Sequence, residues 1–160
     1  MPVKGSITPL PSQKGKKDPI GVYHFSVLID GVPVARFTDA SGFEHSTKII
    51  EYRECDSEGN IHINKVIGST SFSEVTLKRG ITDDNKLWTE WRQKVMDGDY
   101  DGARQTVTII GHSPKGETTA EFKIQNAWVS KWKGPAFSAA GSTVAFEEIT
   151  FTHEGITRTK

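Results

Sequence analysis

The sequence predicts a mainly β protein, an antiparallel β-barrel or sandwich with one flanking α-helix. Several segments between residues 18 and 160 alternate apolar and polar side chains, which is typical of half-buried strands. Turn-forming pairs such as Asp30-Gly31 separate these segments. Only the segment that begins at Thr82 has the spacing of an amphipathic helix. About seven strands and one helix fit a barrel or sandwich that carries the helix on one side.

The first two expected strands form a hairpin. Apolar residues occupy the odd positions from Tyr23 to Ile29, which predicts a strand over residues 22–30. Asp30-Gly31 provides the turn, and residues 34–38 resume the strand pattern.

The segment 44–64 is unusually polar for a strand region. Residues 43–53 and 61–63 are expected to be extended, with a polar turn at 55–60 between them. Charged residues are mixed with apolar ones over 43–53, so charges fall on both faces of this strand. A strand of this kind cannot lie against a core on either face unless its charges are paired. It can be stable where it extends a sheet into a neighbouring subunit, which suggests an assembly.

A strand and the one helix follow. Residues 71–79 predict a strand with Val75 and Leu77 on one face and polar residues on the other. Thr82 is placed to cap the helix, and Gly98 to end it. The helical residues expected to fill the core share one stripe: Leu87, Trp88, Trp91 and Val95.

Three more strands complete the expected fold, over residues 105–111, 120–129 and 142–153. The turns 113–116 and 133–135 separate them. Trp128 is expected in the core, whereas Trp132 stands beside two lysines and is expected to be half exposed.

Composition restricts the class of protein. The chain has 160 residues, a formal net charge of zero, a single cysteine and 35% hydrophobic residues. This length predicts one domain without a disulfide framework, and neutrality argues against a general nucleic-acid binder. Residues 1–17 contain four lysines and no acidic residue, and we expect them to form a flexible basic N-terminal arm. Residues 18–160 are expected to form the β-barrel domain. No apolar run predicts a membrane span or a signal peptide.

Catalytic chemistry is not indicated by any motif. The sequence lacks a phosphate-binding loop, a dinucleotide-binding glycine motif, a metalloprotease motif and a nucleophile elbow. Its five histidines are widely spaced, which gives no support for a metal site. Cys55 has acidic neighbours, which argues against a reactive thiol. Glu147 and Glu148 are adjacent, so on a strand they point to opposite faces and cannot form a carboxylate pair. Lys78-Arg79 is expected to be a solvated strand end. We therefore expect no catalysis, no cofactor and no metal.

A set of short motifs, in order and without large gaps over residues 18–156, carries a family resemblance. The set comprises Asp18-Pro19, the alternating segment from Tyr23 to Gly31, Ser41-Gly42-Phe43, Glu51-Tyr52-Arg53-Glu54, Leu77-Lys78-Arg79-Gly80, Leu87-Trp88, Ala127-Trp128, Lys131-Trp132 with Gly134-Pro135, and His153-Glu154-Gly155. In this combination the chain resembles the inner tube protein of contractile injection systems, the phage-tail-like particles. Two departures concern loops: Cys55-Asp56 replaces a glycine pair, and Lys65-Val66-Ile67-Gly68 lacks a proline.

The resemblance implies a structural subunit. Proteins of this family are β-barrels with a flanking helix that form hexameric rings, and the rings stack into a hollow tube inside a contractile sheath. The implied partners are further copies of the chain, the sheath protein, baseplate or spike proteins, and a payload in the channel. Neither a specific nucleic acid nor direct membrane insertion is expected. Assembly is expected in the cytoplasm of a bacterium or archaeon, within a particle that is released or membrane-anchored.

Two groups of residues follow from this reading. Contacts between rings and between subunits are expected from Glu51, Tyr52, Arg53, Glu54, Cys55, Asp56, Ser57, Glu58, Gly59, Asn60 and Lys65. Residues of the structural motif are Lys78, Arg79, Gly80, Leu87, Trp88, Trp128, Lys131, Trp132, Gly134, Pro135, His153, Glu154 and Gly155. The open alternatives are an adapter ring between spike and tube, a monomeric barrel that binds a small ligand and, more remotely, an enzyme.

Overall fold

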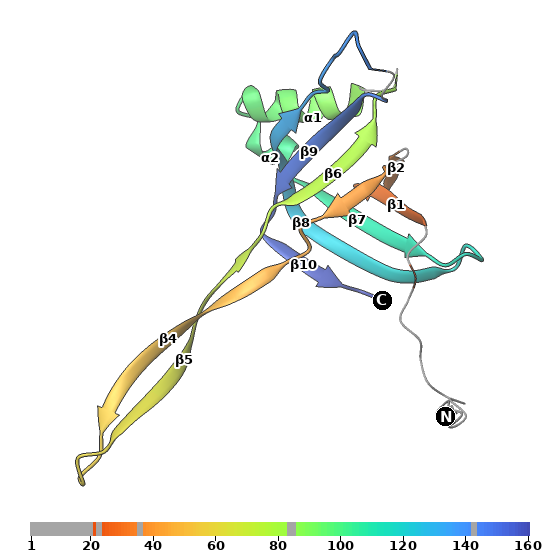
Figure 1. Cartoon of the computed structure of the whole chain (residues 1–160). Helices are drawn as coiled ribbons and strands as arrows, with labels where there is room; N and C mark the ends of the chain where they lie inside the picture. The colour runs from red at the N-terminus through yellow and green to blue at the C-terminus, as the bar shows by residue number, and fades with distance from the viewer. Residues whose placement is uncertain (1–20, 22–23, 35–36, 83–85, 142–143) are drawn as a thin grey trace, which may run out of the picture.

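One strongly curved antiparallel sheet and one separate hairpin make up the strands (Figure 1). A computed structural model of the chain describes residues 21, 24–34, 37–82, 86–141 and 144–160. Within them the sheet has the strand order β2-β1-β7-β8-β9-β6-β3, and β10 pairs with β8 beside this path. The bounds in the sheet are β1 (His24–Ile29), β2 (Val32–Val34), β3 (Asp39–Ser41), β6 (Val75–Gly80), β7 (Gln105–His112), β8 (Thr118–Lys133), β9 (Phe146–Thr152) and β10 (Gly155–Arg158). The mainly β class with a flanking helix is therefore confirmed.

The first hairpin follows the sequence pattern closely. Asp30 and Gly31 have positive φ angles of 49° and 80°, as a tight turn between twisted strands requires. Val27 and Ile29 are buried, so the alternation correctly identified the inward face. The expected hairpin partner is β2, which starts two residues earlier than predicted and pairs with β1. Of the predicted range 34–38, residues 37 and 38 are not in a strand and 35–36 lie outside the described part. A further short strand, β3, pairs with β6.

The long hairpin consists of β4 (His45–Cys55) and β5 (Ile61–Phe72). The sequence predicted β4 well but placed only residues 61–63 in β5 and joined its end to the next strand. The prediction of a single strand over 71–79 was wrong, because the hairpin ends at Phe72 and β6 starts at Val75. At this break the amide of Ser73 donates to the carbonyl of Glu44 over 2.9 Å. Val75 and Leu77 are buried as predicted.

Two helices lie against the sheet, where one was expected. The described part of helix α1 is Lys86–Met96, and it buries Trp88 and Trp91. Leu87 is 36% exposed, so its assignment to the core was wrong. The cap proposed at Thr82 depends on residues 83–85, which lie outside the described part. A short helix, α2 (Tyr100–Ala103), follows Gly98, and no helix in the described ranges is long and apolar enough to cross a membrane.

The C-terminal strands differ from prediction mainly in length. β8 spans 16 residues and changes partners along its course: β7 and β10 flank Phe122–Gln125, and β9 pairs with Trp128–Lys133. Asn126, with φ 50°, lies between these two stretches. Of the predicted strand 142–153, β9 forms Phe146–Thr152, residues 144–145 are not in a strand, and residues 142–143 lie outside the described part. β10, which follows after His153 and Glu154, was not predicted.

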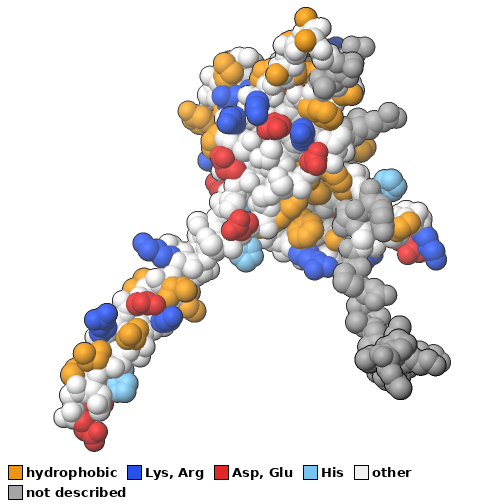
Figure 2. All heavy atoms as spheres, in the orientation of Figure 1, with side chains coloured by type: hydrophobic (Ala, Val, Ile, Leu, Met, Phe, Trp, Pro, Cys, Tyr) orange, Lys and Arg blue, Asp and Glu red, His pale blue; other side chains and the backbone are white. Residues whose placement is uncertain are grey.

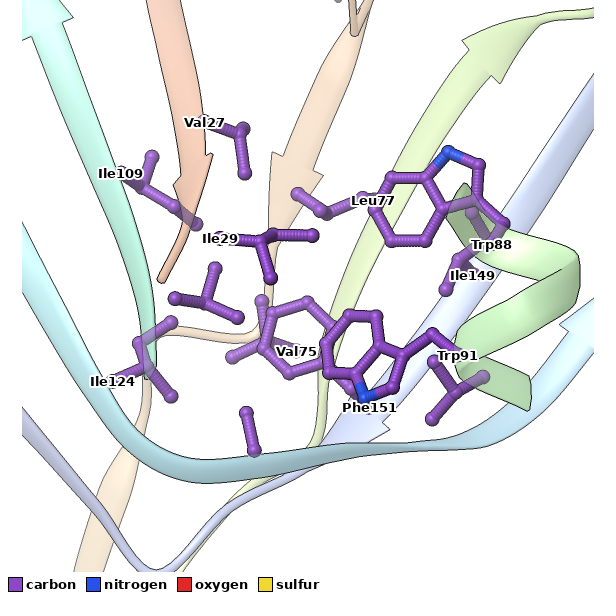
Figure 3. Close-up of a cluster of buried hydrophobic side chains, with 13 residues drawn as sticks. Val27, Ile29, Val75, Leu77, Trp88, Trp91, Ile109, Ile124, Ile149 and Phe151 are labelled. Atoms are coloured by element: carbon purple, nitrogen blue, oxygen red, sulfur yellow. The ribbon is translucent and has the colours of Figure 1, made fainter. Parts of the chain in front are cut away.

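The core lies between the two halves of the curved sheet, with α1 at one end (Figure 3). Val27, Ile109 and Ile124 come from one half, and Leu77, Ile149 and Phe151 from the other. The ring centroids of Trp91 and Phe151 are 6.2 Å apart. The indole Nε1 of Trp91 donates to the carbonyl of Ala103 over 2.5 Å. Trp128 is half-buried and lines a cavity of about 500 Å³ beside α2, so its assignment to the core was only partly right.

Gly42 holds the chain where it enters the long hairpin, and an Ala there should destabilise the protein strongly. Its φ is +94°, and a Cβ would lie 2.1 Å from the carbonyl oxygen of Glu74. Gly116→Ala is a matched control, since Gly116 has φ +83° but open space around it. We expect a loss of about 1–2 kcal/mol for the control and several kcal/mol for Gly42→Ala in urea unfolding. Equal losses would contradict the close packing at Gly42.

Candidate interaction surface

The long hairpin extends away from the rest of the protein. We call β4, β5 and the turn 56–60 the arm, and the remainder of the described chain the body. β4 and β5 pair with each other and with no other described strand, and all eleven residues of β4 are exposed. At about 3.3 Å per residue, β4 alone reaches about 36 Å from the body. The arm is thus a two-stranded ribbon with both faces in solvent (Figure 1).

Apolar side chains occur on both faces of the arm. Residues that pair directly across two strands share a face, so Ile50 lies with Val66 on one face, and Ile49 with Ile67 on the other. Ile67 is 85% exposed. The exposed apolar residues of the arm are Ile49, Ile50, Tyr52, Ile61, Ile63, Val66, Ile67 and Phe72 (Figure 2). An apolar surface of this extent, with no cover from the body, is typical of a protein interface.

The tip of the arm is held in one shape by Asp56. Its Oδ1 accepts hydrogen bonds from the amides of Glu58 and Asn60, over 2.9 and 2.8 Å. Its Oδ2 accepts from His62 Nε2 and Asn60 Nδ2, over 3.0 and 3.1 Å. These bonds, that from His62 first, lower the pKa of Asp56 from 3.8 to about 2. The tip therefore stays ordered by a carboxylate that is ionised at any ordinary pH.

The contact residues predicted from sequence all lie on the arm. Lys65 forms an ion pair with Glu51 over 3.3 Å, and Asn64 Nδ2 donates to Glu54 over 2.7 Å. Apart from Tyr52, the apolar members of the surface were not predicted, although isoleucines at both odd and even positions of the two strands were a visible signal. Whether any of these residues contacts another chain stays a prediction.

The root of the arm is fixed to the body by His153. This buried imidazole donates from Nε2 to the carbonyl of Ser73 over 2.9 Å, and its ring lies 5.7 Å from that of Phe72 at the end of β5. Next to it, Glu154 accepts from Asn126 Nδ2 over 2.6 Å. His153, Glu154 and Gly155 of the structural motif therefore connect the arm, β8 and the start of β10.

The other motif residues meet at one buried ion pair. Arg79 Nε donates to Glu147 Oε1, and both side chains are almost fully buried. The indole Nε1 of Trp132 donates to the second oxygen, Oε2, over 3.0 Å, and the Arg79 guanidinium lies 5.5 Å from the Trp88 ring. The prediction that Arg79 is a solvated strand end was wrong, because Glu147 is its partner across β6 and β9.

The structure places the remaining motif residues around this pair. Lys78, on the opposite face of β6, lies with Nζ 5.0 Å from the centre of the Phe146 ring. A Cβ at Gly134 would lie 2.9 Å from the Trp132 ring, which explains the small residue there. Trp132 is 52% exposed, as predicted, and Lys131 is exposed. Gly80 pairs with Phe146 next to the buried ion pair, whereas Leu87 is exposed on α1. Pro135 is half-buried and follows Gly134. No group of three or more metal-ligating residues occurs among the described residues.

Removal of the His62 side chain should raise the pKa of Asp56 toward 3.8, since its hydrogen bond is the largest cause of the shift. The pKa of Asp56 is lower in the folded tip than in the unfolded chain. Ionised Asp56 therefore stabilises the tip fully above pH 3.8, and this stabilisation is lost as the pH falls through about 2. A carbon-detected NMR titration of His62→Ala measures the change. Asn64→Ala is the control, since Asn64 bonds Glu54 instead. An unchanged pKa in His62→Ala would refute the assignment.

Arg79→Met should destabilise the protein by about 3–5 kcal/mol, because it leaves the Glu147 carboxylate buried without its cation. Urea unfolding followed by tryptophan fluorescence measures the loss. Lys133→Met breaks the exposed Lys133–Glu148 pair, 3.8 Å apart, and should change stability by less than about 1 kcal/mol. A second substitution, Glu147→Leu, should recover part of the loss in Arg79→Met. Equal effects of the two Met variants would contradict the account.

Comparisons with known proteins agree with this geometry. The chain is similar to a protein in the sheath-tube complex of the extracellular contractile injection system PVC (24% identity, 95% of this chain, 99% of the other, TM-score 0.70). It is also similar to the anti-feeding prophage tube-terminating cap (22%, 98% and 98%, 0.72) and to Hcp1 from Flavobacterium johnsoniae (16%, 84% and 94%, 0.52). No curated protein matches the sequence. Residues 22–157 match the T4-like virus tail tube protein gp19 family, and the chain therefore belongs to this family of tail tube proteins.

Proposed function

We propose that the protein is the structural subunit of the inner tube of a contractile injection system, in which hexameric rings stack around a hollow channel. The observation that carries this proposal is the arm, whose two faces both present apolar side chains and which no described part of the body covers. Membership of the tail tube family supports the same conclusion.

The physical argument concerns the stability of the arm. An isolated two-stranded hairpin is at best marginally stable in water. Burial of an exposed Ile side chain contributes about 1.5–3 kcal/mol, so a partner that covers residues such as Ile49, Ile63 and Ile67 stabilises the arm substantially. Because both faces are apolar, the arm fits between two surfaces better than on one. A stack of rings offers such a position, with a neighbour in the same ring and a subunit of the next.

The surrounding partners follow from the same reading. Sheath protein on the outside, baseplate or spike proteins at one end and a payload in the channel are the partners proposed for this chain. The likeness to a tube-terminating cap keeps a second role open within the class, a ring at the end of the tube. A ring of this kind contacts another ring on one side only, which distinguishes it from a subunit of a long tube. We place assembly in the cytoplasm, within a phage-tail-like particle.

Ile67→Glu should prevent stacking while leaving the body folded. A carboxylate on this 85% exposed position has no effect on the core but must lose its hydration when a neighbour covers the arm. A loss of about 2 kcal/mol in the association free energy per contact corresponds to about a 30-fold higher protein concentration needed for assembly. Sedimentation and negative-stain microscopy measure this, with circular dichroism as the check of folding.

Lys115→Glu is the matched control, because it adds a carboxylate in the turn between β7 and β8, away from the arm. Long tubes from the natural chain and the control, and only free rings or monomers from Ile67→Glu, support the proposal. Single closed rings or short end pieces from the natural chain indicate a terminal ring instead. A monomer at all concentrations overturns the proposal and favours a monomeric binding protein.

A further inference from the structure

A groove lies between α1 and the last part of β8. Helix α1 itself lies at the end of the body opposite the arm (Figure 1). The volume of the groove is about 400 Å³. We call it the α1–β8 groove. Helix residues Arg92 and Met96 form one wall, and strand residues Lys131 and Trp132 the other. None of these residues belongs to the arm, and the assembly proposal above assigns them no role.

The walls of the groove combine apolar surface with positive charge. Met96 is 66% exposed and Trp132 52%, which is high for side chains of this size at a concave site. Arg92 uses Nη1 to donate to the carbonyl of Val129 over 3.2 Å, which leaves most of its N–H donors for another acceptor. Lys131 makes no hydrogen bond or ion pair with any described residue.

No carboxylate lines this groove. Three acidic groups that bond to residues of the groove already have partners. Glu74 accepts from Ser130 Oγ over 3.0 Å, Asp97 accepts from Gln93 Nε2 over 2.7 Å, and Glu147 accepts from Arg79 and Trp132. Trp88 also lines the groove, and its indole Nε1, which is buried, has no acceptor in the described part of the chain. The groove therefore suits a segment that brings a carboxylate together with an apolar side chain.

The tip of the arm has this composition. It carries Glu54, Asp56 and Glu58 with no Lys or Arg between residues 54 and 60, and acidic side chains are visible at its end in Figure 2. Asp56 and Glu54 have hydrogen-bond partners within the arm, whereas the carboxylate of Glu58 has none among the described residues. Ile61, the first residue of β5 after the turn 56–60, is 66% exposed.

The placement of the two surfaces matches their chemistry. The arm points away from one end of the body, and α1, whose residues line the groove, lies toward the other (Figure 1). When copies stack in the direction of the arm, the tip of each arm approaches the α1 end of the next copy. A contact of this head-to-tail kind repeats along the stack without closing.

We infer that the α1–β8 groove receives the arm tip of a second copy of this chain, with Glu58 paired to Lys131 and Ile61 packed on Met96 and Trp132. The inference rests on the proposed stacking and names the acceptor surface for the arm. Each of the two charged groups lacks a partner among the described residues of its own chain, so the pair forms without breaking any interaction seen there. The contact is charge-assisted, and high salt weakens it.

Charge reversal in the full chain tests this pairing. Glu58→Lys and Lys131→Glu should each raise the concentration needed for assembly at least tenfold, since each places like charges together. The double variant restores the attraction and should assemble within about threefold of the natural chain. Lys115→Glu controls for net charge, and thermal unfolding confirms that each variant folds. Normal assembly of both single variants, or a double variant no better than either one, overturns the pairing.

A carbodiimide, which couples a carboxylate to an amine only in direct contact, gives a second measurement. Mass spectrometry of treated assemblies should find a Glu58–Lys131 crosslink between copies, and none in dilute monomer. A crosslink from Glu58 to a different lysine of a neighbouring copy overturns the groove as the acceptor. Failure of Ile67→Glu to affect assembly would instead refute the proposed role of the arm, so the two failures are distinguishable.

Discussion

The arm imposes the main physical constraint on this protein. A two-stranded ribbon with isoleucines on both faces has no core of its own, and the body does not supply one. A hairpin of this kind is marginal in water, so in the proposed assembly neighbouring copies supply the free energy that keeps it extended. A low overall hydrophobic fraction of 35% agrees with a protein that completes part of its apolar packing only on assembly. The segment with the least support from the body is thus the one through which we propose that copies meet.

The body is built to hold the arm in a fixed direction. Gly42 packs against the carbonyl of Glu74, and His153 bonds the carbonyl of Ser73, so both strands of the arm are attached at their root. Behind this root, the buried Arg79–Glu147 pair joins β6 to β9, and Trp132 connects β8 to the same carboxylate. Rigid attachment matters because a freely rotating arm would lose more conformational entropy when it docks.

Sequence reasoning succeeded where the signal was local. The turn at Asp30-Gly31, the inward face of β1 and the buried side of α1 at Trp88 and Trp91 all follow from patterns within about ten residues. It failed where partners are distant in the chain. The burial of Arg79 was not predicted, because its partner Glu147 lies 68 residues away in the sequence. The predicted β5 was too short, because a strand exposed on both faces need not alternate apolar and polar residues. The two-sided polarity of 44–64 predicted an assembly surface, and this stays a prediction. Only the structure shows that the segment belongs to a hairpin, β4 and β5, that pairs with no other described strand.

Amide hydrogen exchange of the arm tests the central claim most directly, because it reports backbone opening in β4 and β5 separately from the body. In dilute monomer, the account predicts fast exchange throughout both strands while β7 and β8 stay protected. In the assembled state, it predicts that protection of β4 and β5 rises to the level of the body. Strong protection of the arm already in the monomer, or no gain on assembly, would contradict the claim that neighbouring copies stabilise the arm.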